Sequence, residues 1–192
     1  MIIKKLAIFA SGSGTNAENI IRYFTGHGNV LVSLVLSNNK DAYVLKRAGK
    51  YNIATVVFDR DSFYKTDIIL NKLIDNQIDM IVLAGFLWLV PENILKSYPA
   101  KIINIHPALL PKYGGKGMYG EKVHQVVLDN REKESGITIH YVNEEYDKGS
   151  IIFQAKCRIL PADTPDSLAA RVHELEYKYY PEVIDRLIRE GS

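Results

Sequence analysis

Two polar side chains, Asn104 and His106, alternate with isoleucines at the end of an apolar run that Pro107 closes. In an extended chain, side chains two residues apart project to the same side, so these two would face one point. An amide N–H and an imidazole that converge in this way could polarise a carbonyl group and stabilise a developing oxyanion. Histidine can also transfer a proton near neutral pH. Such a pair alone is more often structural than catalytic, so the catalytic interpretation needs a further partner.

Asp147 supplies that partner from a separate segment, the acidic connection at 143–149. An acid beside a catalytic imidazole raises the pKa of the imidazole and orients the ring. The alternative is an ordinary turn aspartate, because Asp-x-Gly is common turn chemistry. The chain has four further histidines, which are His27, His124, His140 and His173. They have no comparable setting, and their spacing offers no metal-ligand motif. We therefore predict a catalytic group of Asn104, His106 and Asp147, without a metal.

A glycine-rich turn, Ser11-Gly12-Ser13-Gly14-Thr15-Asn16, follows the first apolar run and precedes an expected helix. Such a turn leaves backbone N–H groups free, and the helix dipole favours an anion there, so a phosphate is the natural ligand. The alternative is a tight turn that needs glycine for its conformation only. Ala17 replaces the third glycine of the dinucleotide motif, and no acid ends the second strand, which disfavours NAD. The lysine of a nucleoside triphosphate loop is missing as well.

Alternating apolar and helical segments must position these residues. Strands are expected at 6–10, 30–36, 55–58, 80–84 and 102–105, and helices at 16–24, 42–50, 62–75 and 91–96. The strand segments are continuously apolar, which is typical of a parallel sheet covered on both faces. We predict an α/β fold with an open, doubly wound, mainly parallel, Rossmann-like sheet. Ligands of such sheets bind beyond the carboxyl ends of the strands.

The alternation changes after residue 135. Two neighbouring strands at 136–142 and 150–159 are expected to form an antiparallel C-terminal extension of the sheet. A final helix begins near Thr164 and contains Pro181, where a kink is expected. The loop at 111–120 is rich in glycine and lysine and is too flexible in composition for a core. Because no repeat or low-complexity linker interrupts the chain, we predict one domain, 1–192.

Composition narrows the class of protein. Lys and Arg total 24 against 22 acidic residues, so a broad nucleic-acid or membrane-surface binder is not indicated. The single cysteine, Cys157, excludes an intrachain disulfide framework and is expected to be a structural thiol. No apolar run approaches the roughly 20 residues of a bilayer span, and the apolar start is too short for a signal peptide. We predict a cytoplasmic protein without a nucleic-acid or membrane partner.

Four motifs together resemble the phosphoribosylglycinamide formyltransferases, a family of folate-dependent enzymes of purine biosynthesis. They are GSGTN at 12–16, LAGFLWLV at 83–90, INIHPALLPKY at 103–113 and EEYDKGSIIFQAK at 144–156. They occur in family order across nearly the whole chain, so together they are highly specific. The resemblance implies the formyltransferase fold and transfer of a formyl group from the co-substrate 10-formyltetrahydrofolate to the amine of 5-phosphoribosylglycinamide. The amine would attack directly, through a tetrahedral intermediate.

The resemblance also implies roles for individual residues. Asn104 would donate to the oxyanion, His106 would donate or carry a proton, and Asp147 would raise the histidine pKa or relay the amine's proton through water. The phosphate and ribose would be bound by Gly12, Ser13, Gly14, Thr15, Asn16, His173 and Glu176. The folate would be bound by Leu87, Trp88, Leu89, Val90, Asn104, Asn143, Glu144, Asp147 and Arg60. Trp88 stands where the family commonly has a basic residue.

Two alternatives remain. Formyltetrahydrofolate hydrolases and methionyl-tRNA formyltransferases share the Asn, His and Asp. They usually carry an extra N-terminal or C-terminal domain, which we expect this chain to lack. A non-enzymatic nucleotide-binding module would retain the glycine-rich turn, but it would have no use for Asn104, His106 and Asp147 together.

Overall fold

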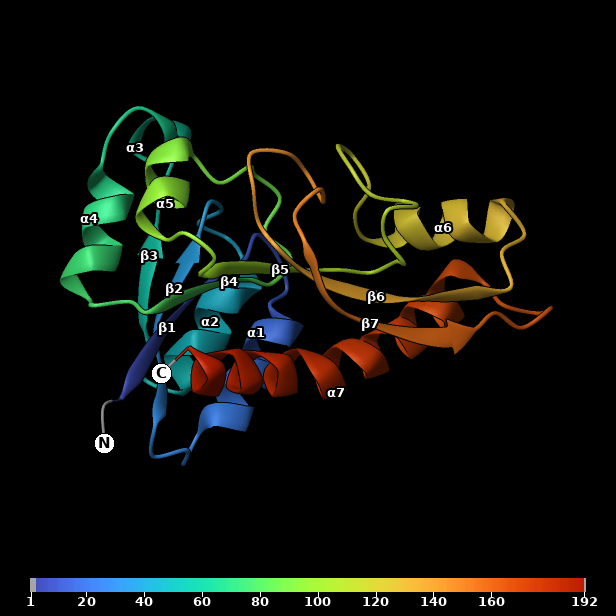
Figure 1. The fold of residues 1–192 in the computed structure, drawn as a ribbon, viewed down its shortest axis with the longest axis horizontal. Coiled ribbons are helices and arrows are strands. Elements are labelled where there is room, and N and C mark those ends of the chain that lie inside the picture. The colour runs from blue at the N-terminus through green and yellow to red at the C-terminus, as the bar shows by residue number, and fades with distance from the viewer. Residues whose placement is uncertain (1–2, 192) are drawn as a thin grey trace. The chain divides into compact units, whose positions relative to one another are not determined.

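The computed structural model describes residues 3–191 (Figure 1). Its seven strands follow the order β3-β2-β1-β4-β5-β6-β7. The chain forms two compact units, and the boundary between them falls inside β5, after Ile103. Each unit is described by itself below.

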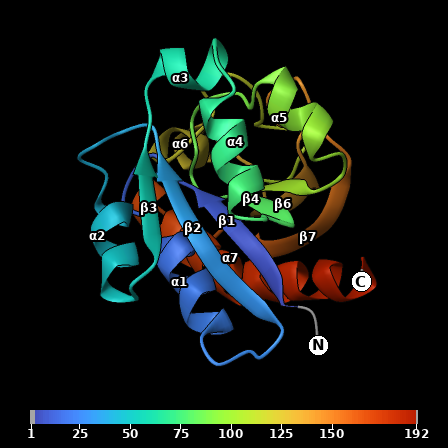
Figure 2. The same cartoon turned by 90° about the vertical axis from the view of Figure 1, so that its left-hand side faces the viewer.

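The first unit has the doubly wound arrangement that the sequence predicts. Its elements are β1 (Lys4–Phe9), α1 (Thr15–Phe24), β2 (Val30–Ser37), α2 (Tyr43–Lys50), β3 (Ala54–Val57), α3 (Arg60–Tyr64), α4 (Ile68–Asp75), β4 (Met80–Leu83), α5 (Glu92–Ser97) and the start of β5 (Ile102–His106). β1 pairs in parallel with β2 and β4, and β2 pairs in parallel with β3. α1 and α2 lie on one face of these strands, and α4 and α5 lie on the other (Figure 2). The prediction of a doubly wound parallel sheet is therefore confirmed.

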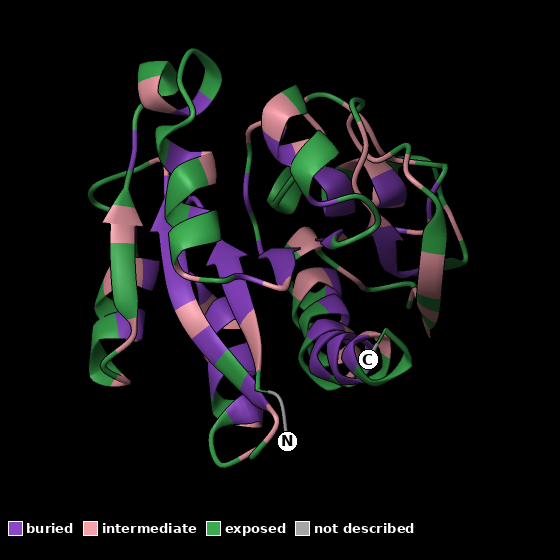
Figure 3. Cartoon of the chain, turned by 60° about the vertical axis from the view of Figure 1, so that its left-hand side comes forward, coloured by how far each residue is buried: buried purple, intermediate pink, exposed green. Residues whose placement is uncertain are grey.

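Burial follows the position of each strand in the sheet. All four residues of β4 are buried, because neighbouring strands and helices cover them on every side. β3 is mostly exposed, and Val57 retains 50% of its accessible surface (Figure 3). The expectation that every apolar strand is covered on both faces is wrong for β3. As an edge strand it has one neighbouring strand, so its apolar side chains are only partly covered.

The single helix expected at 62–75 is in fact two helices. α3 begins after Asp59, whose side chain accepts the Ser62 N–H while the Ser62 hydroxyl accepts the Asp59 N–H. Thr66 then ends this segment, because its hydroxyl donates to the Ser62 carbonyl and accepts the Ile68 N–H. These local hydrogen bonds compete with a continuous helix and break it between Tyr64 and Ile68.

The second unit contains the end of β5, α6 (Glu121–Asp129), β6 (Glu134–Tyr141), β7 (Ile151–Arg158) and α7 (Pro165–Glu190). β6 and β7 pair antiparallel, so the predicted antiparallel extension is confirmed. Gly136 permits this close pairing, because a Cβ there would lie 1.9 Å from the Ala155 carbonyl oxygen. α6 is absent from the elements expected from the sequence, although Val123 and Val127 are spaced as one buried helix face.

A capping box between Thr164 and Ser167 starts α7, and Pro165 occupies its first turn. The helix continues through Pro181 and packs against β6, β7 and α6. Among residues 3–191, no helix has both the length and the apolar character needed to cross a bilayer.

Candidate active site

Asn104, His106 and Asp147 come together in the second unit, at the carboxyl end of β5. Asn104 Nδ2 lies 3.5 Å from Asp147 Oδ1, and His106 Nδ1 lies 3.5 Å from Asp147 Oδ2. The side chains of His106 and Asp147 are only 4% and 11% exposed. Because alternate residues of a strand share one face, β5 directs both side chains to the same carboxylate. An amide donor, an imidazole and a carboxylate therefore meet where little water weakens their interactions.

A short loop after β5 holds two of these side chains through its backbone. His106 Nε2 donates to the Tyr113 carbonyl oxygen at 2.7 Å, and the Gly115 N–H donates to Asp147 Oδ2 at 2.8 Å. A carbonyl oxygen can only accept, so Nε2 carries a proton in either charge state of the ring. At Gly114, a Cβ would lie 3.1 Å from the Asp147 Cβ and 2.5 Å from a Leu110 methyl. Glycine therefore allows this loop to pass close beside the carboxylate.

Burial lowers the pKa of His106 below its ordinary value. The charge of Asp147 and the hydrogen bond to the Tyr113 carbonyl act in the opposite direction, while His140 adds to the decrease. From the sequence we expect Asp147 to raise this pKa. Its contribution has that sign, but the net direction is the reverse, because desolvation of the ring outweighs the carboxylate.

Asp147 lies in the connection between β6 and β7, with a positive φ of 57°. The connection closes tightly at Gly149, where a Cβ would lie 1.7 Å from the Tyr141 carbonyl oxygen. Burial favours a higher pKa for Asp147, but the neighbouring His140 and His106 rings and the Gly115 N–H together hold it below its usual range. Asp147 is thus both a turn residue and a carboxylate that stays charged at neutral pH although only 11% of its side chain is exposed.

His140 also belongs to this group, and the prediction that set it apart from Asn104, His106 and Asp147 is wrong. Its Nδ1 donates to the Tyr141 carbonyl at 2.8 Å, so in the neutral ring Nε2 is an acceptor. Asn104 Nδ2 lies 3.1 Å from that Nε2, which also lies 3.6 Å from Asp147 Oδ1. His140 therefore orients the Asn104 amide. The available signal is its place at the end of β6, directly before the connection that carries Asp147.

The predicted phosphate turn lies in the first unit. Gly14 caps α1 in the left-handed region, with φ 73°, and a Cβ there would lie 2.4 Å from the Val44 Cβ. Arg47 of α2 holds the turn from outside, because its Nε donates to the Ser13 carbonyl at 2.8 Å and its guanidinium pairs with Glu18. α1 has no side-chain cap. Its N-terminus thus has the geometry and the dipole that suit an anion.

Residues 87–90 follow β4 in the same unit and join an aromatic cluster. The Trp88 ring contacts the rings of Phe58, Phe63, Tyr64 and Phe86. The Arg60 guanidinium lies over the Trp88 ring, 4.9 Å from its centroid. The Leu87 N–H donates to the Ser11 hydroxyl at 3.1 Å, which ties this segment to the glycine-rich turn. Tyr64 holds the other end of the segment 87–90, because the Tyr64 hydroxyl donates to the Leu89 carbonyl at 3.0 Å.

The remaining predicted residues lie in the second unit. Glu176 is buried on α7, and its Oε2 lies 3.9 Å from Nε2 of the half-exposed His173. Burial lowers the pKa of nearby His124 to about 4, with smaller contributions from the charges of His173 and His106. His124 Nδ1 is buried and has no hydrogen-bond partner among the described residues. The Asn143 side chain accepts the Glu145 N–H at 3.1 Å.

Between Ile3 and Gly191, the structure contains no group of three or more His, Cys, Asp or Glu side chains that could hold a metal ion.

Comparisons with known proteins show which family and which solved structures the chain is similar to. The formyl transferase family matches residues 4–184. The chain is 40% identical over 187 residues to the phosphoribosylglycinamide formyltransferase of Haemophilus influenzae, covering 95% of this chain and 86% of that protein. It is 42% identical over 193 residues to the chloroplastic phosphoribosylglycinamide formyltransferase of Arabidopsis thaliana, covering 97% of this chain but 66% of the plant protein. The crystal structure of phosphoribosylglycinamide formyltransferase from Bacillus halodurans superposes with a TM-score of 0.88 at 33% identity, over 98% of this chain and 97% of that one.

Proposed function

Because the chain belongs to the formyl transferase family, we propose that it transfers a formyl group from 10-formyltetrahydrofolate to the amine of 5-phosphoribosylglycinamide. The observation that carries the proposal is the close group of Asn104, Asp147 and the buried His106 in a chain that the family matches across residues 4–184. Both sequence relatives described above bear the name of this activity. The formyl-folate is a co-substrate here, since it is consumed in each turnover.

The reaction is a direct acyl transfer. The lone pair of the amine attacks the formyl carbon, and the carbonyl π electrons move to the oxygen, which becomes a tetrahedral oxyanion. The bond from the formyl carbon to N10 of the folate then breaks, and its electron pair stays on N10. N10 takes up one proton and the attacking amine gives up one, so charge and atoms balance.

Each catalytic side chain has a separate task in this proposal. Asn104 donates an amide N–H to the oxyanion, for which its 3.5 Å contact with Asp147 is easily given up. His106, in its protonated form, donates toward the same oxygen or carries the proton that N10 receives. Asp147 holds the positive charge on His106 and accepts the amine's proton through water. His140 keeps the Asn104 amide turned toward the reaction.

The two substrates are proposed to use the other predicted residues. The phosphate is bound by the turn of Gly12, Ser13, Gly14, Thr15 and Asn16, and the ribose side by His173 and Glu176. The folate is bound by Leu87, Trp88, Leu89, Val90, Asn143 and Glu144. Arg60, which stacks on Trp88, supplies the positive charge for the folate tail.

An assay of formyl transfer with and without the phosphoribosyl amine tests the proposal. We expect formyl-folate to be consumed only when the amine is present, with the formyl group recovered on the amine. Consumption without the amine would assign the chain to the hydrolases instead. Binding of the nucleotide without any consumption of formyl-folate would support a non-enzymatic module.

The phosphate turn gives the first prediction. Gly14→Val places a branched side chain at a positive φ, against Val44, and displaces the turn. Hydrogen bonds to a charged group contribute roughly 1.5–3 kcal/mol, so the KM for the phosphorylated amine rises about 10- to 100-fold. The measurement is KM for each substrate, with folding checked by circular dichroism. Gly49→Ala in α2, where a Cβ meets nothing within 4 Å, is the matched control. Unchanged binding by a folded Gly14→Val protein would contradict the phosphate assignment.

Cys157 gives the second prediction, which is that it is dispensable. Burial raises the pKa of its thiol above the usual value, so little of the nucleophilic thiolate is present at neutral pH. Transfer is direct, without a formyl-enzyme, so Cys157→Ala keeps most of the wild-type kcat. Mass spectrometry of the enzyme during turnover is the second measurement. A formylated Cys157 would contradict direct transfer.

We also propose that residues 1–192 act as one catalytic domain, because the family match includes both compact units. We further propose that the protein is cytoplasmic. Its partners are small molecules, and it does not bind a nucleic acid. The balance of 24 basic and 22 acidic residues and the single cysteine support these two points.

A further inference from the structure

The carbonyl group that orients His106 belongs to a residue with unusual backbone geometry. Tyr113 has a positive φ of 58°, although it is not a glycine. A bulky residue pays a conformational penalty in this region, so surrounding contacts must hold it there. The direction of the Tyr113 carbonyl depends on that backbone conformation, and so does the 2.7 Å hydrogen bond from His106 Nε2. Whatever fixes Tyr113 therefore also fixes the imidazole.

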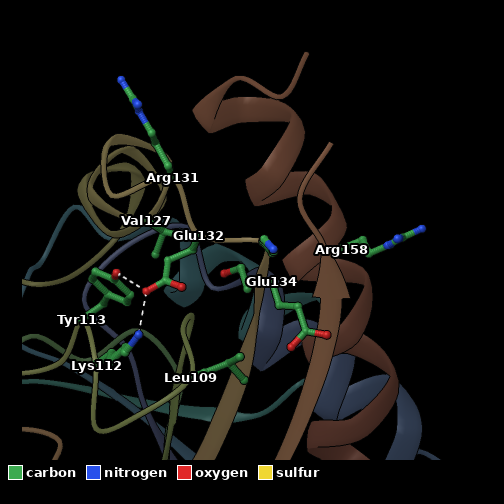
Figure 4. Close-up of a pocket in the computed structure, with 10 residues that line it drawn as sticks. Leu109, Lys112, Tyr113, Val127, Arg131, Glu132, Glu134 and Arg158 are labelled. Atoms are coloured by element: carbon green, nitrogen blue, oxygen red, sulfur yellow. Dashed lines mark hydrogen bonds and ion pairs between the residues drawn. The ribbon is translucent and has the colours of Figure 1, made fainter. Parts of the chain in front are cut away.

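Glu132 is the residue that fixes the Tyr113 side chain. The Tyr113 hydroxyl donates to Glu132 Oε1 at 2.6 Å, and Lys112 Nζ donates to the same oxygen at 2.8 Å (Figure 4). Glu132 itself lies between α6 and β6, so it is held by secondary structure on both sides. The short phenol–carboxylate bond joins the loop after β5 to this fixed segment.

At neutral pH the Tyr113 phenol keeps the proton that it donates, and the Glu132 carboxylate has the negative charge that accepts it. The hydrogen bonds from Lys112 and Tyr113 lower the pKa of Glu132, which stays a carboxylate. The hydrogen bond to Glu132 raises the pKa of Tyr113 to about 12, so the phenol keeps its proton. The contact is thus a charge-assisted hydrogen bond, which is roughly twice as strong as a neutral one.

We infer that Glu132 is a positioning residue for the reaction: through the Tyr113 hydroxyl and backbone, it aims the carbonyl that orients His106. Among the described residues, no hydrogen bond or ion pair joins Glu132 to the three catalytic side chains. Its effect reaches His106 only through Tyr113. The inference rests on the proposed function for its kinetic part, and on the structure alone for its effect on the imidazole.

Glu134 offers a matched control, because it lines the same cavity as Glu132. Glu132 and Glu134 both line a cavity of about 700 Å³, together with Leu109, Val127 and Arg158. Glu134 also pairs with a lysine, because Lys156 Nζ lies 3.0 Å from its Oε2. In the part of the chain that the structure describes, no hydrogen bond or ion pair joins Glu134 to the loop that holds His106. Removing Glu134 therefore removes a similar carboxylate and ion pair without disturbing Tyr113.

The experiment compares Glu132→Ala, Glu132→Gln and Glu134→Ala with the wild type. For Glu132→Ala we expect kcat to fall about tenfold with KM for both substrates nearly unchanged, a smaller loss than the roughly hundredfold that a 1 Å misplacement can cause. Glu132→Gln restores most of the activity, because an amide oxygen can still accept from the Tyr113 hydroxyl. Glu134→Ala behaves as the wild type.

The second readout is the His106 pKa, measured without substrate by NMR titration of the labelled imidazole, with His106→Gln used to assign the signal. Loss of the Tyr113 carbonyl contact lowers this pKa, since that contact raises it in the wild type. We expect the decrease in Glu132→Ala and not in Glu134→Ala. This readout stays decisive even if the chain does not formylate the expected amine.

Three results would overturn the inference. One is an unshifted His106 pKa in Glu132→Ala, another is an equal shift in Glu134→Ala, and the third is a change in KM with kcat unaffected. If Glu132→Ala does not fold, Tyr113→Phe takes its place with the same expected results, because it removes only the hydroxyl that joins Tyr113 to Glu132.

Discussion

Asn104→Ala is expected to lower kcat by about 10²–10³, the usual effect of losing one oxyanion donor, with little change in substrate binding. The oxygen that Asn104 serves becomes negative only on the way to the tetrahedral species. Its hydrogen bond is therefore much stronger in the transition state than in the ground state, and its loss reduces kcat rather than raising KM. Steady-state kinetics with both substrates measures the effect.

The isosteric variant Asn104→Asp distinguishes the loss of the N–H donor from the loss of side-chain volume. A carboxylate of the same size can accept but cannot donate, and it stands beside the negative Asp147. We expect a loss at least as large as that of the alanine variant. Asn130→Ala, an exposed amide at the end of α6, is the matched control and keeps full activity. A folded Asn104→Ala enzyme with full kcat would remove Asn104 from the mechanism.

The sequence predicts most of the fold because each strand of the parallel sheet is a separate apolar run. All four residues of β4 are apolar and buried, so the hydrophobic pattern of the sequence and the burial in the structure assign the same strand. The prediction fails where local hydrogen bonds decide the structure. The Asp59 cap and the Thr66 hydroxyl divide one amphipathic segment into α3 and α4, and neither changes the apolar pattern.

The catalytic side chains are predictable for a different reason. Asn104 and His106 share a face of one strand, which the period of two makes visible in the sequence. His140 escapes detection because it meets Asn104 only through the pairing of β6 with β5, two strands that are far apart in the sequence. Its position directly before the connection that carries Asp147 is the one sign of this contact in the sequence.

Backbone groups and burial account for the rest of what the sequence does not reveal. The Tyr113 carbonyl and the Gly115 N–H contact His106 and Asp147, but every residue except proline carries the same two groups, so no pattern marks them. The low pKa of His106 arises mainly from the loss of water around the ring. That loss depends on packing, whereas the sequence shows only that an acid is available to oppose it.

Asp147→Asn is expected to lower kcat by roughly 10²-fold or more, within the range that general acid–base groups contribute. The change is isosteric, and the amide oxygen of the new side chain can still accept the Gly115 N–H, so the loop is retained. What disappears is the negative charge beside His106. Burial already lowers the pKa of His106, and Asp147 offsets part of that decrease. Without the offset the pKa falls further, and less of the imidazolium is present at a given pH.

The lower His106 pKa shifts the pH–rate profile of Asp147→Asn in a definite direction. Since the protonated imidazole is the active form, activity falls as the pH rises through the His106 pKa, and a lower pKa moves that limb of the pH–rate profile to lower pH. Profiles of kcat for wild type and variant measure the shift, with folate binding near wild type as the control for folding. Asp129→Asn removes a charge from an exposed position on α6 and leaves the profile unchanged. If Asp147→Asn kept full activity and an unshifted profile, Asp147 would be only a turn residue, and the mechanism would need another source of charge for His106.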